Sequence, residues 1–226
     1  EGRTTPSRGL DATAKFIATV LSRAGVKPAG DDGTYFQKIT LRKEKLVPEG
    51  TDLDLNGQKF AYGKDYFAGA NAGSASGTMI YAGDGWFIKA KNIDPYEGLD
   101  PKGKIVIVNQ ISGLPAGLTV KDLTAGKSGE DWILPATYAQ KKGAVGIIAL
   151  LPLLTQATPD ALENMRRSAE GGSFYPEKLP RPGVQLPTIA AGVRLAQAIF
   201  AKETVDARTI DARTILASFP AGTVIG

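Results

Sequence analysis

The side chains that most often carry out chemistry in proteins are missing from this sequence. Its 226 residues include no histidine and no cysteine. Imidazole is the usual general base and the commonest zinc ligand, and the thiolate is both a nucleophile and a metal ligand. We therefore exclude Ser-His-Asp and Cys-His catalysis, thiolate metal sites and a disulfide framework for these residues.

The carboxylates could still form a metal site, because Ca²⁺ and Mg²⁺ accept oxygen ligands alone. Asp52 and Asp54 have the spacing of one strand face, and residues 31–33 read Asp-Asp-Gly, a turn pattern. Neither stretch has the ligand spacing of a calcium-binding loop. We therefore interpret both as exposed positions that hold no metal.

A glycine-rich stretch at residues 69–77 has some features of a catalytic loop. A phosphate-binding loop needs Gly-Lys-Ser/Thr at the start of a helix, and here we predict a strand to follow. A nucleophile elbow needs serine at the centre of Gly-x-Ser-x-Gly, whereas the centre of residues 73–77 is Ala75. We predict a linker. A catalytic Ser-Lys dyad, or a pair of catalytic carboxylates as in glycosidases, remains formally possible. The spacing of these residues in the sequence identifies no particular pair.

The overall composition is that of an ordinary globular protein with a small excess of positive charge. Apolar residues make up 42% and charged residues 22%, with a formal net charge of +4. The basic residues form only short clusters, so we predict no nucleic-acid partner. The longest apolar stretch, residues 143–154, is too short for a membrane span and contains Pro152, so we predict no span.

The hydrophobic pattern predicts a mixed α/β fold. Apolar residues recur on one helical face over residues 9–24, and the β-branched run at 104–109 is typical of a strand buried on both faces. A helix over 132–142 and a second buried strand at 144–150 complete a parallel βαβ unit. We also predict strands at 34–41, 77–82, 86–90 and 186–190, a hairpin at 53–60 turning at Asn56-Gly57, helices at 159–169, 192–201 and 208–218, and loops at 61–75 and 171–187.

Four segments, taken in order, resemble a protease-associated domain. Residues 78–85 resemble its opening strand and Gly-x-Gly turn, and residues 94–108 resemble its aspartate-tyrosine, glycine-leucine-aspartate and lysine-glycine-lysine pattern before a buried strand. Residues 136–150 resemble its alanine-rich helix and Gly-Ile-Ile strand, and residues 186–189 resemble its closing strand. The resemblance covers about residues 48–200 and implies a swivelling β/β/α domain with a mixed sheet and flanking helices.

The beginning of the sequence carries a second resemblance. Residues 9–37 resemble the first helix and strand of co-catalytic zinc aminopeptidases, a family similar to glutamate carboxypeptidase II and the transferrin receptor. In many members a protease-associated domain is inserted after these elements. The resemblance therefore implies two domains, with residues 1–47 from the peptidase domain and residues 48–226 from the inserted domain. Because the family includes exported bacterial enzymes, it also implies a periplasmic or extracellular location.

The catalytic residues of that family lie in segments after the inserted domain. They are two histidines and three carboxylates as zinc ligands, with a glutamate as general base, and no residue of this sequence matches them. We therefore expect no catalytic residue and no cofactor here, and we expect zinc in a separate catalytic domain. The helix at 9–24 would cover a sheet of that domain, and we predict that it is loosely held alone.

The resemblance implies a non-catalytic accessory module that docks on its own catalytic domain. It would shape substrate access or mediate a protein contact, so its partner would be a peptide substrate or another protein. We expect the stretch 155–187 to face this partner, because arginine and tyrosine can bind a carboxylate or stack on a peptide. The candidate side chains are Arg166, Arg167, Tyr175 and Arg181. Two alternatives stay open: a stand-alone, receptor-like binding module, and a histidine-free hydrolase.

Overall fold

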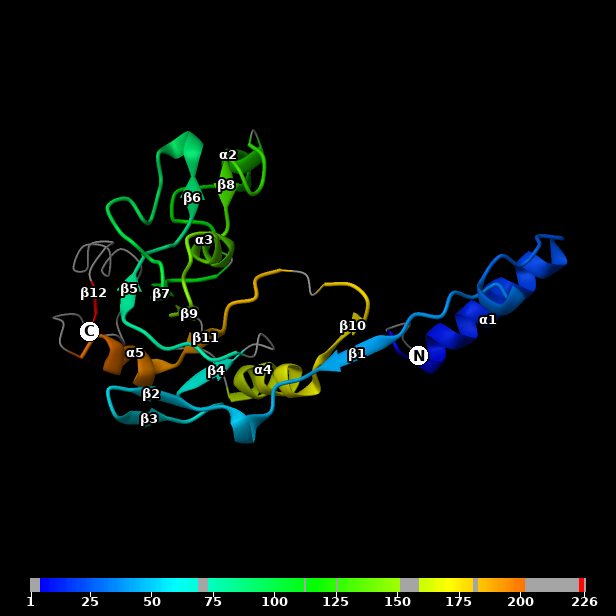
Figure 1. Ribbon diagram of the computed structural model, residues 1–226, viewed down its shortest axis with the longest axis horizontal. Helices are drawn as coiled ribbons and strands as arrows, with labels where there is room; N and C mark the ends of the chain where they lie inside the picture. The colour runs from blue at the N-terminus through cyan, green and yellow to red at the C-terminus, as the bar shows by residue number, and fades with distance from the viewer. Residues whose placement is uncertain are drawn as a thin grey trace. The chain divides into compact units, whose positions relative to one another are not determined.

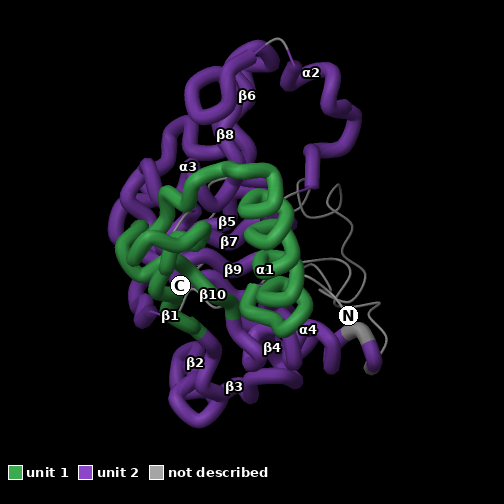
Figure 2. The backbone as a smooth tube through the Cα atoms, turned by 90° about the vertical axis from the view of Figure 1, so that its right-hand side faces the viewer, with its two compact units in different colours: residues 1–44, 173–181 green, residues 45–172, 182–226 purple. Residues whose placement is uncertain are grey.

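The chain folds into two compact units. The computed structural model describes residues 5–68, 73–111, 113–124, 126–150, 159–180, 183–201 and 224–225. Unit 1 comprises residues 1–44 and 173–181, and unit 2 comprises residues 45–172 and 182–226 (Figure 2). The mixed α/β class predicted from the sequence is confirmed. The sequence placed a domain boundary at residue 47, and the first boundary between the compact units follows Glu44.

Unit 2 is built around a mixed sheet of six strands (Figure 1). Its four central strands are parallel, and one antiparallel strand lies at each edge. The strand order is β12 (Val224–Ile225), β5 (Met79–Tyr81), β7 (Ile105–Val108), β9 (Gly146–Ala149), β11 (Thr188–Ala191) and β4 (Tyr66–Ala68). The predicted parallel pairing of the strands near 104–109 and 144–150 is therefore confirmed.

Both faces of this sheet are covered, and this explains the continuous apolar runs of its strands. Successive side chains of a strand point to opposite faces. Tyr81 and Ile107 thus belong to one apolar cluster and Ile80 and Val106 to the other. The first cluster is covered by helix α5 (Val193–Ile199) and the second by helix α3 (Pro135–Lys141). A parallel sheet covered in this way favours nearly continuous apolar runs, often rich in valine and isoleucine.

The predicted helix at 132–142 is shorter than expected. Trp132 and Ile133 form strand β8, which pairs with β6 (Phe87–Ile88) in a small antiparallel ribbon. Helix α3 begins at Pro135, a residue suited to the first helical position because that position needs no N–H donor. The first two residues of the predicted helix therefore belong to strand β8, because they pair with β6.

The predicted hairpin at 53–60 is confirmed as strands β2 (Leu53–Leu55) and β3 (Gln58–Phe60). Asn56 and Gly57 both have positive φ, at 52° and 85°, as a tight two-residue turn requires. The predicted loop at 61–75 is wrong in part, because residues 66–68 form the edge strand β4. Its partner β11 lies more than a hundred residues later, so no local pattern reveals the pairing.

The remaining elements of unit 2 are short, apart from one helix. They are the 3₁₀ turns η2 (Pro48–Gly50) and η3 (Lys89–Lys91), and the helices α2 (Val120–Thr124) and α4 (Pro159–Gly171). Helix α4 agrees with the helix predicted at 159–169. The helix predicted at 208–218 lies outside the described residues. No helix in the described part of the chain combines the length and hydropathy that crossing a membrane requires.

Unit 1 consists of one helix, a compact turn and a two-stranded ribbon. Helix α1 (Arg8–Arg23) starts where the Ser7 hydroxyl accepts the Leu10 N–H. The strand predicted at 34–41 is wrong: residues 31–33 form the 3₁₀ turn η1 (Asp31–Gly33), and strand β1 begins only at Leu41 (Leu41–Glu44). The Asp31 carboxylate accepts the Lys38 N–H at 2.6 Å. Such local bonds compete with strand pairing.

The predicted loop at 171–187 is also wrong in part. Residues 173–176 form strand β10 (Ser173–Pro176), which pairs antiparallel with β1. The register sets Arg42 opposite Tyr175 and Lys43 opposite Phe174. The pairing joins segments about 130 residues apart, and the glycines and prolines nearby conceal it from a local analysis.

The apolar face of α1 stays largely open. No described residue of unit 1 falls in the buried class. Phe16, Ile17 and Val20 expose 69%, 51% and 49% of their surface. In the segment after the helix, the Tyr35 hydroxyl donates to the Val26 carbonyl, and this contact buries no apolar side chain. An isolated helix of this length is marginal in water, so α1 depends on an apolar partner surface.

The burial of β7 predicts a large stability effect at Val106. Val106 is fully buried, whereas Val120 exposes 68% of its surface. Val106→Ala should lower the free energy of unfolding by about 2 kcal/mol, because two buried methyl groups are lost. The matched control Val120→Ala should change it by less than about 0.5 kcal/mol. Urea unfolding followed by tryptophan fluorescence measures both, and equal losses would contradict the buried position of β7.

The open face of α1 predicts weak protection of its amides. Amide exchange measured by NMR on the isolated chain should be orders of magnitude faster in residues 12–23 than in β7, because local opening of α1 disrupts no buried core. Protection in α1 as strong as in β7, in a monomeric sample, would show that the helix is firmly packed and would refute this prediction.

Candidate functional site

Three of the four carboxylates considered for a metal site make local contacts instead. Asp54 accepts the Gly57 N–H at 2.7 Å and so stabilises the hairpin turn. Asp31 accepts the Lys38 N–H, and Asp32 pairs with the Lys38 ammonium at 2.6 Å. Among the residues that the structure describes, no group of three or more histidine, cysteine or acidic side chains could hold a metal ion.

Two of the four candidate side chains, Arg166 and Arg167, lie on helix α4 and are joined through Glu163. Arg166 donates to both carboxylate oxygens of Glu163 at 2.8 Å and to both oxygens of Glu170 at 3.1 Å. Arg167 donates to Glu163 at 2.8 Å. The spacing of three and four residues brings these charges to one helix face. Binding of a substrate carboxylate by Arg166 would have to break bonds within its own helix.

The two arginines also set the ionisation of Glu163. Hydrogen bonds from Arg166 and then Arg167 lower the pKa of its carboxyl from 4.5 to about 2. Glu163 therefore stays charged under mildly acidic conditions, and its ion pairs with Arg166 and Arg167 are kept there. At neutral pH the positive charges of Arg166 and Arg167 are therefore balanced by the carboxylates of Glu163 and Glu170 on the same helix.

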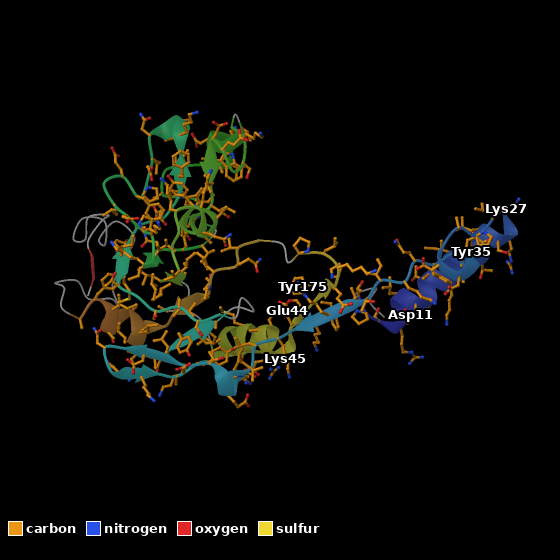
Figure 3. All side chains as sticks on the ribbon, viewed as in Figure 1. Asp11, Lys27, Tyr35, Glu44, Lys45 and Tyr175 are labelled. Atoms are coloured by element: carbon orange, nitrogen blue, oxygen red, sulfur yellow. The ribbon has the colours of Figure 1, made fainter. Side chains whose placement is uncertain are left out.

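The other two candidates do not join this pair within one unit. Tyr175 lies in strand β10 of unit 1, and Figure 3 shows it on the same ribbon as Glu44. Arg181 lies outside the described residues. The stretch 155–187 thus contributes helix α4 to one unit and strand β10 to the other, where the sequence predicted a helix at 159–169 followed by a loop.

A buried polar chain joins the carboxyl ends of the parallel strands β5 and β7, where α/β proteins often place their sites. The Tyr81 hydroxyl donates to Asn109 at 2.7 Å, and the Asn109 amide donates to Asp84 at 2.8 Å. Asn109 also donates its backbone N–H to the Gly83 carbonyl. Burial raises the pKa of Tyr81 well above its ordinary value, so it stays neutral. Each of these bonds is made within the fold, which indicates a structural role.

The two tryptophans are also held by the fold. Trp86 is buried and donates its indole N–H to the Gly113 carbonyl at 2.7 Å. Trp132 donates to the Gly126 carbonyl at 3.3 Å, and the two rings lie 6.2 Å apart. Both indole N–H groups are thus engaged by backbone carbonyls of the fold.

A pocket of about 250 Å³ opens beside the β2–β3 hairpin. Its lining combines the carboxylates of Asp52 and Asp54 and the ammonium of Lys59 with apolar and aromatic side chains. Sequence analysis identified Asp52 and Asp54, and the hairpin register sets Lys59 directly opposite Asp54.

Comparison with known proteins identifies no relative: no family model, curated protein or solved structure matches this chain.

The ionic network of α4 makes a testable prediction about pH. A carboxyl whose pKa is lowered on folding stabilises the fold above its unfolded pKa of 4.5, and this contribution is lost as the pH falls toward 2. The ¹³C carboxyl resonance of Glu163 should therefore titrate near 2. Arg166→Gln should move its midpoint toward 4.5, whereas Arg23→Gln on α1 should leave it unchanged. A midpoint near 4.5 in the unmodified protein would refute the network.

Proposed function

We propose that this chain is a non-catalytic accessory part of an exported zinc-dependent aminopeptidase. Unit 2 would correspond to a protease-associated domain that shapes substrate access or mediates a protein contact. Unit 1 would supply the first helix and strand of the peptidase domain itself. The module would dock on its own catalytic domain through unit 1.

The observation that carries this proposal is the difference between the two units. Unit 2 has two apolar clusters of its own, one on each face of its sheet. Unit 1 buries none of its described residues, although α1 is amphipathic and exposes Phe16 and Ile17 by more than half. A helix of this kind gains its stability by covering another surface. A peptidase sheet is the surface that the motif resemblance implies.

The segment with the most specific motif resemblance has a compatible local structure. Its turns are made by Asp94, which accepts the Tyr96 N–H at 2.9 Å, and Asp100, which accepts the Lys102 N–H at 3.0 Å. The segment then enters β7, whose Val106 and Val108 are fully buried. Aspartate at such positions favours turns by bonding its own backbone, so these residues have a clear reason to precede a buried strand.

The zinc chemistry of the proposed parent enzyme does not fit the residues of this chain. A co-catalytic site of that family uses two histidines, and the sequence contains none. We derive no catalytic step from these residues. Their proposed contribution is to position the module and restrict the approach of peptides to a catalytic domain.

The test measures zinc and activity together. The purified chain, incubated with zinc and then dialysed, should retain far less than one zinc ion per molecule by mass spectrometry of metals, and it should not hydrolyse leucine p-nitroanilide. Stoichiometric zinc with hydrolysis that a chelator abolishes would overturn the accessory role, as would hydrolysis without metal.

The parent enzyme supplies the matching positive test. The reading frame that contains this chain should also encode a histidine-containing peptidase domain, and the product of the whole frame should hydrolyse the same substrate. Ile17→Asp should weaken docking and lower this activity or the yield of folded enzyme, with Lys15→Asp on the polar face as the control. A reading frame without a peptidase domain would favour a stand-alone, receptor-like module instead.

A further inference from the structure

Asn56 is the only asparagine of the sequence that precedes a glycine. In such a pair the glycine nitrogen can attack the asparagine side-chain amide, because glycine has no Cβ to shield its own backbone nitrogen. Asparagine is one of the thermally labile residues of proteins. Asn56 and Gly57 are both exposed and form the two-residue turn between β2 and β3, with positive φ at each. The turn therefore presents a reactive pair to water.

The Gly57 nitrogen is held by a hydrogen bond within the turn. Its N–H donates to the Asp54 carboxylate at 2.7 Å. The nitrogen attacks only after it has lost its proton. A carboxylate that accepts this N–H opposes that loss, because it favours the protonated amide and disfavours a second negative charge nearby. Asp54, Asn56 and Gly57 are all exposed, so no packed core adds to this protection. The bond from Gly57 to Asp54 is thus the contact that restrains the pair.

A second exposed asparagine provides an internal comparison. Asn92 has a φ of 52°, the same value as Asn56. The N–H that follows it, on Ile93, is also hydrogen-bonded, to the Ile88 carbonyl at 3.1 Å. The difference lies in the next side chain, since the β-branched Ile93 crowds its own nitrogen and Gly57 does not. The two sites share exposure and backbone angle, and they differ in the access to the attacking nitrogen.

We propose that Asn56 is a site of spontaneous deamidation that is restrained by Asp54. The Gly57 nitrogen loses its proton and forms a bond to Cγ of Asn56. The bond from Cγ to the side-chain nitrogen breaks, and this nitrogen leaves with the proton as ammonia. The intermediate is a cyclic succinimide, and no atom is oxidised or reduced. Water then opens the ring at either carbonyl, which gives aspartate or isoaspartate at position 56. The reaction needs no reagent other than water.

The two products have different consequences for the hairpin. Aspartate accepts positive φ as asparagine does, so the turn is kept and gains one negative charge. Isoaspartate places an extra methylene in the backbone of a two-residue turn, whose length fixes the strand register. That register sets Leu53 opposite Phe60, which is buried in an apolar cluster of unit 2. The isoaspartate form should therefore melt several degrees lower than the unmodified chain, whereas the variant Asn56→Asp should keep its melting temperature.

The experiment follows each asparagine of the folded chain during incubation at mildly alkaline pH. Aliquots are digested under acidic conditions, and liquid chromatography with mass spectrometry separates the asparagine, aspartate and isoaspartate forms of each peptide. Asn56 should convert to both products, whereas Asn92 and the exposed Asn164 on helix α4 should keep their amides over the same time. A synthetic peptide of residues 46–59, which lacks the folded turn, should convert faster than the chain.

Substitutions at two aspartates test the restraint. Asp54→Ala removes the acceptor of the Gly57 N–H and should speed the conversion of Asn56 about tenfold, the factor that one hydrogen bond to a charged group contributes. Asp54→Asn keeps an acceptor oxygen without the charge, so its rate should lie between the two. Asp100→Ala is the matched control, because Asp100 is exposed and accepts the Lys102 N–H at 3.0 Å in another turn. It should leave the rate at Asn56 unchanged.

Three results would overturn the proposal. One is an unchanged Asn56 in the folded chain at a time when the peptide has converted, which would show that the folded turn blocks the attack. Another is conversion of Asn92 as fast as that of Asn56, because Gly57 would then play no special part. The third is equal acceleration by Asp54→Ala and Asp100→Ala. The reaction involves neither zinc nor a peptidase domain, so it is tested independently of the accessory role.

Discussion

The burial of both faces of the parallel strands is the constraint on which the rest of unit 2 depends. Strands β5, β7 and β9 place alternate side chains into two apolar clusters, and a helix must cover each one. This requirement explains the helices α3 and α5 on opposite faces of the sheet. Because backbone groups in such a core cannot reach water, every strand needs neighbours, and only the edge positions accept the short antiparallel strands β4 and β12.

The polar residues at the carboxyl ends of these strands are used to secure the core. Asn109 is buried and bonded to Tyr81, Asp84 and the Gly83 backbone, and so joins the ends of β5 and β7. A buried amide with fewer partners would destabilise the sheet, because its desolvation would be uncompensated. The position that often holds a site in α/β proteins is therefore used here for structure, and the open pocket lies elsewhere, beside the β2–β3 hairpin.

Several charged side chains have an opposite charge supplied within the fold. On α4, Arg166 meets two carboxylates of its own helix, so its charge is balanced before any partner arrives. On the β2–β3 hairpin, the register sets the oppositely charged Lys59 and Asp54 directly across from each other. Charge alone thus says little about binding, and what matters is whether the opposite charge is already supplied nearby.

The sequence by itself determined the elements that local chemistry controls. The apolar period of α1, the Asn56-Gly57 turn, the β-branched run of β7 and the absence of imidazole chemistry all follow from residues close together in the chain. Only the tertiary structure decided the pairing of β4 with β11 and of β1 with β10. These pairings join segments more than a hundred residues apart, and a local pattern carries no record of which distant segment a strand will meet.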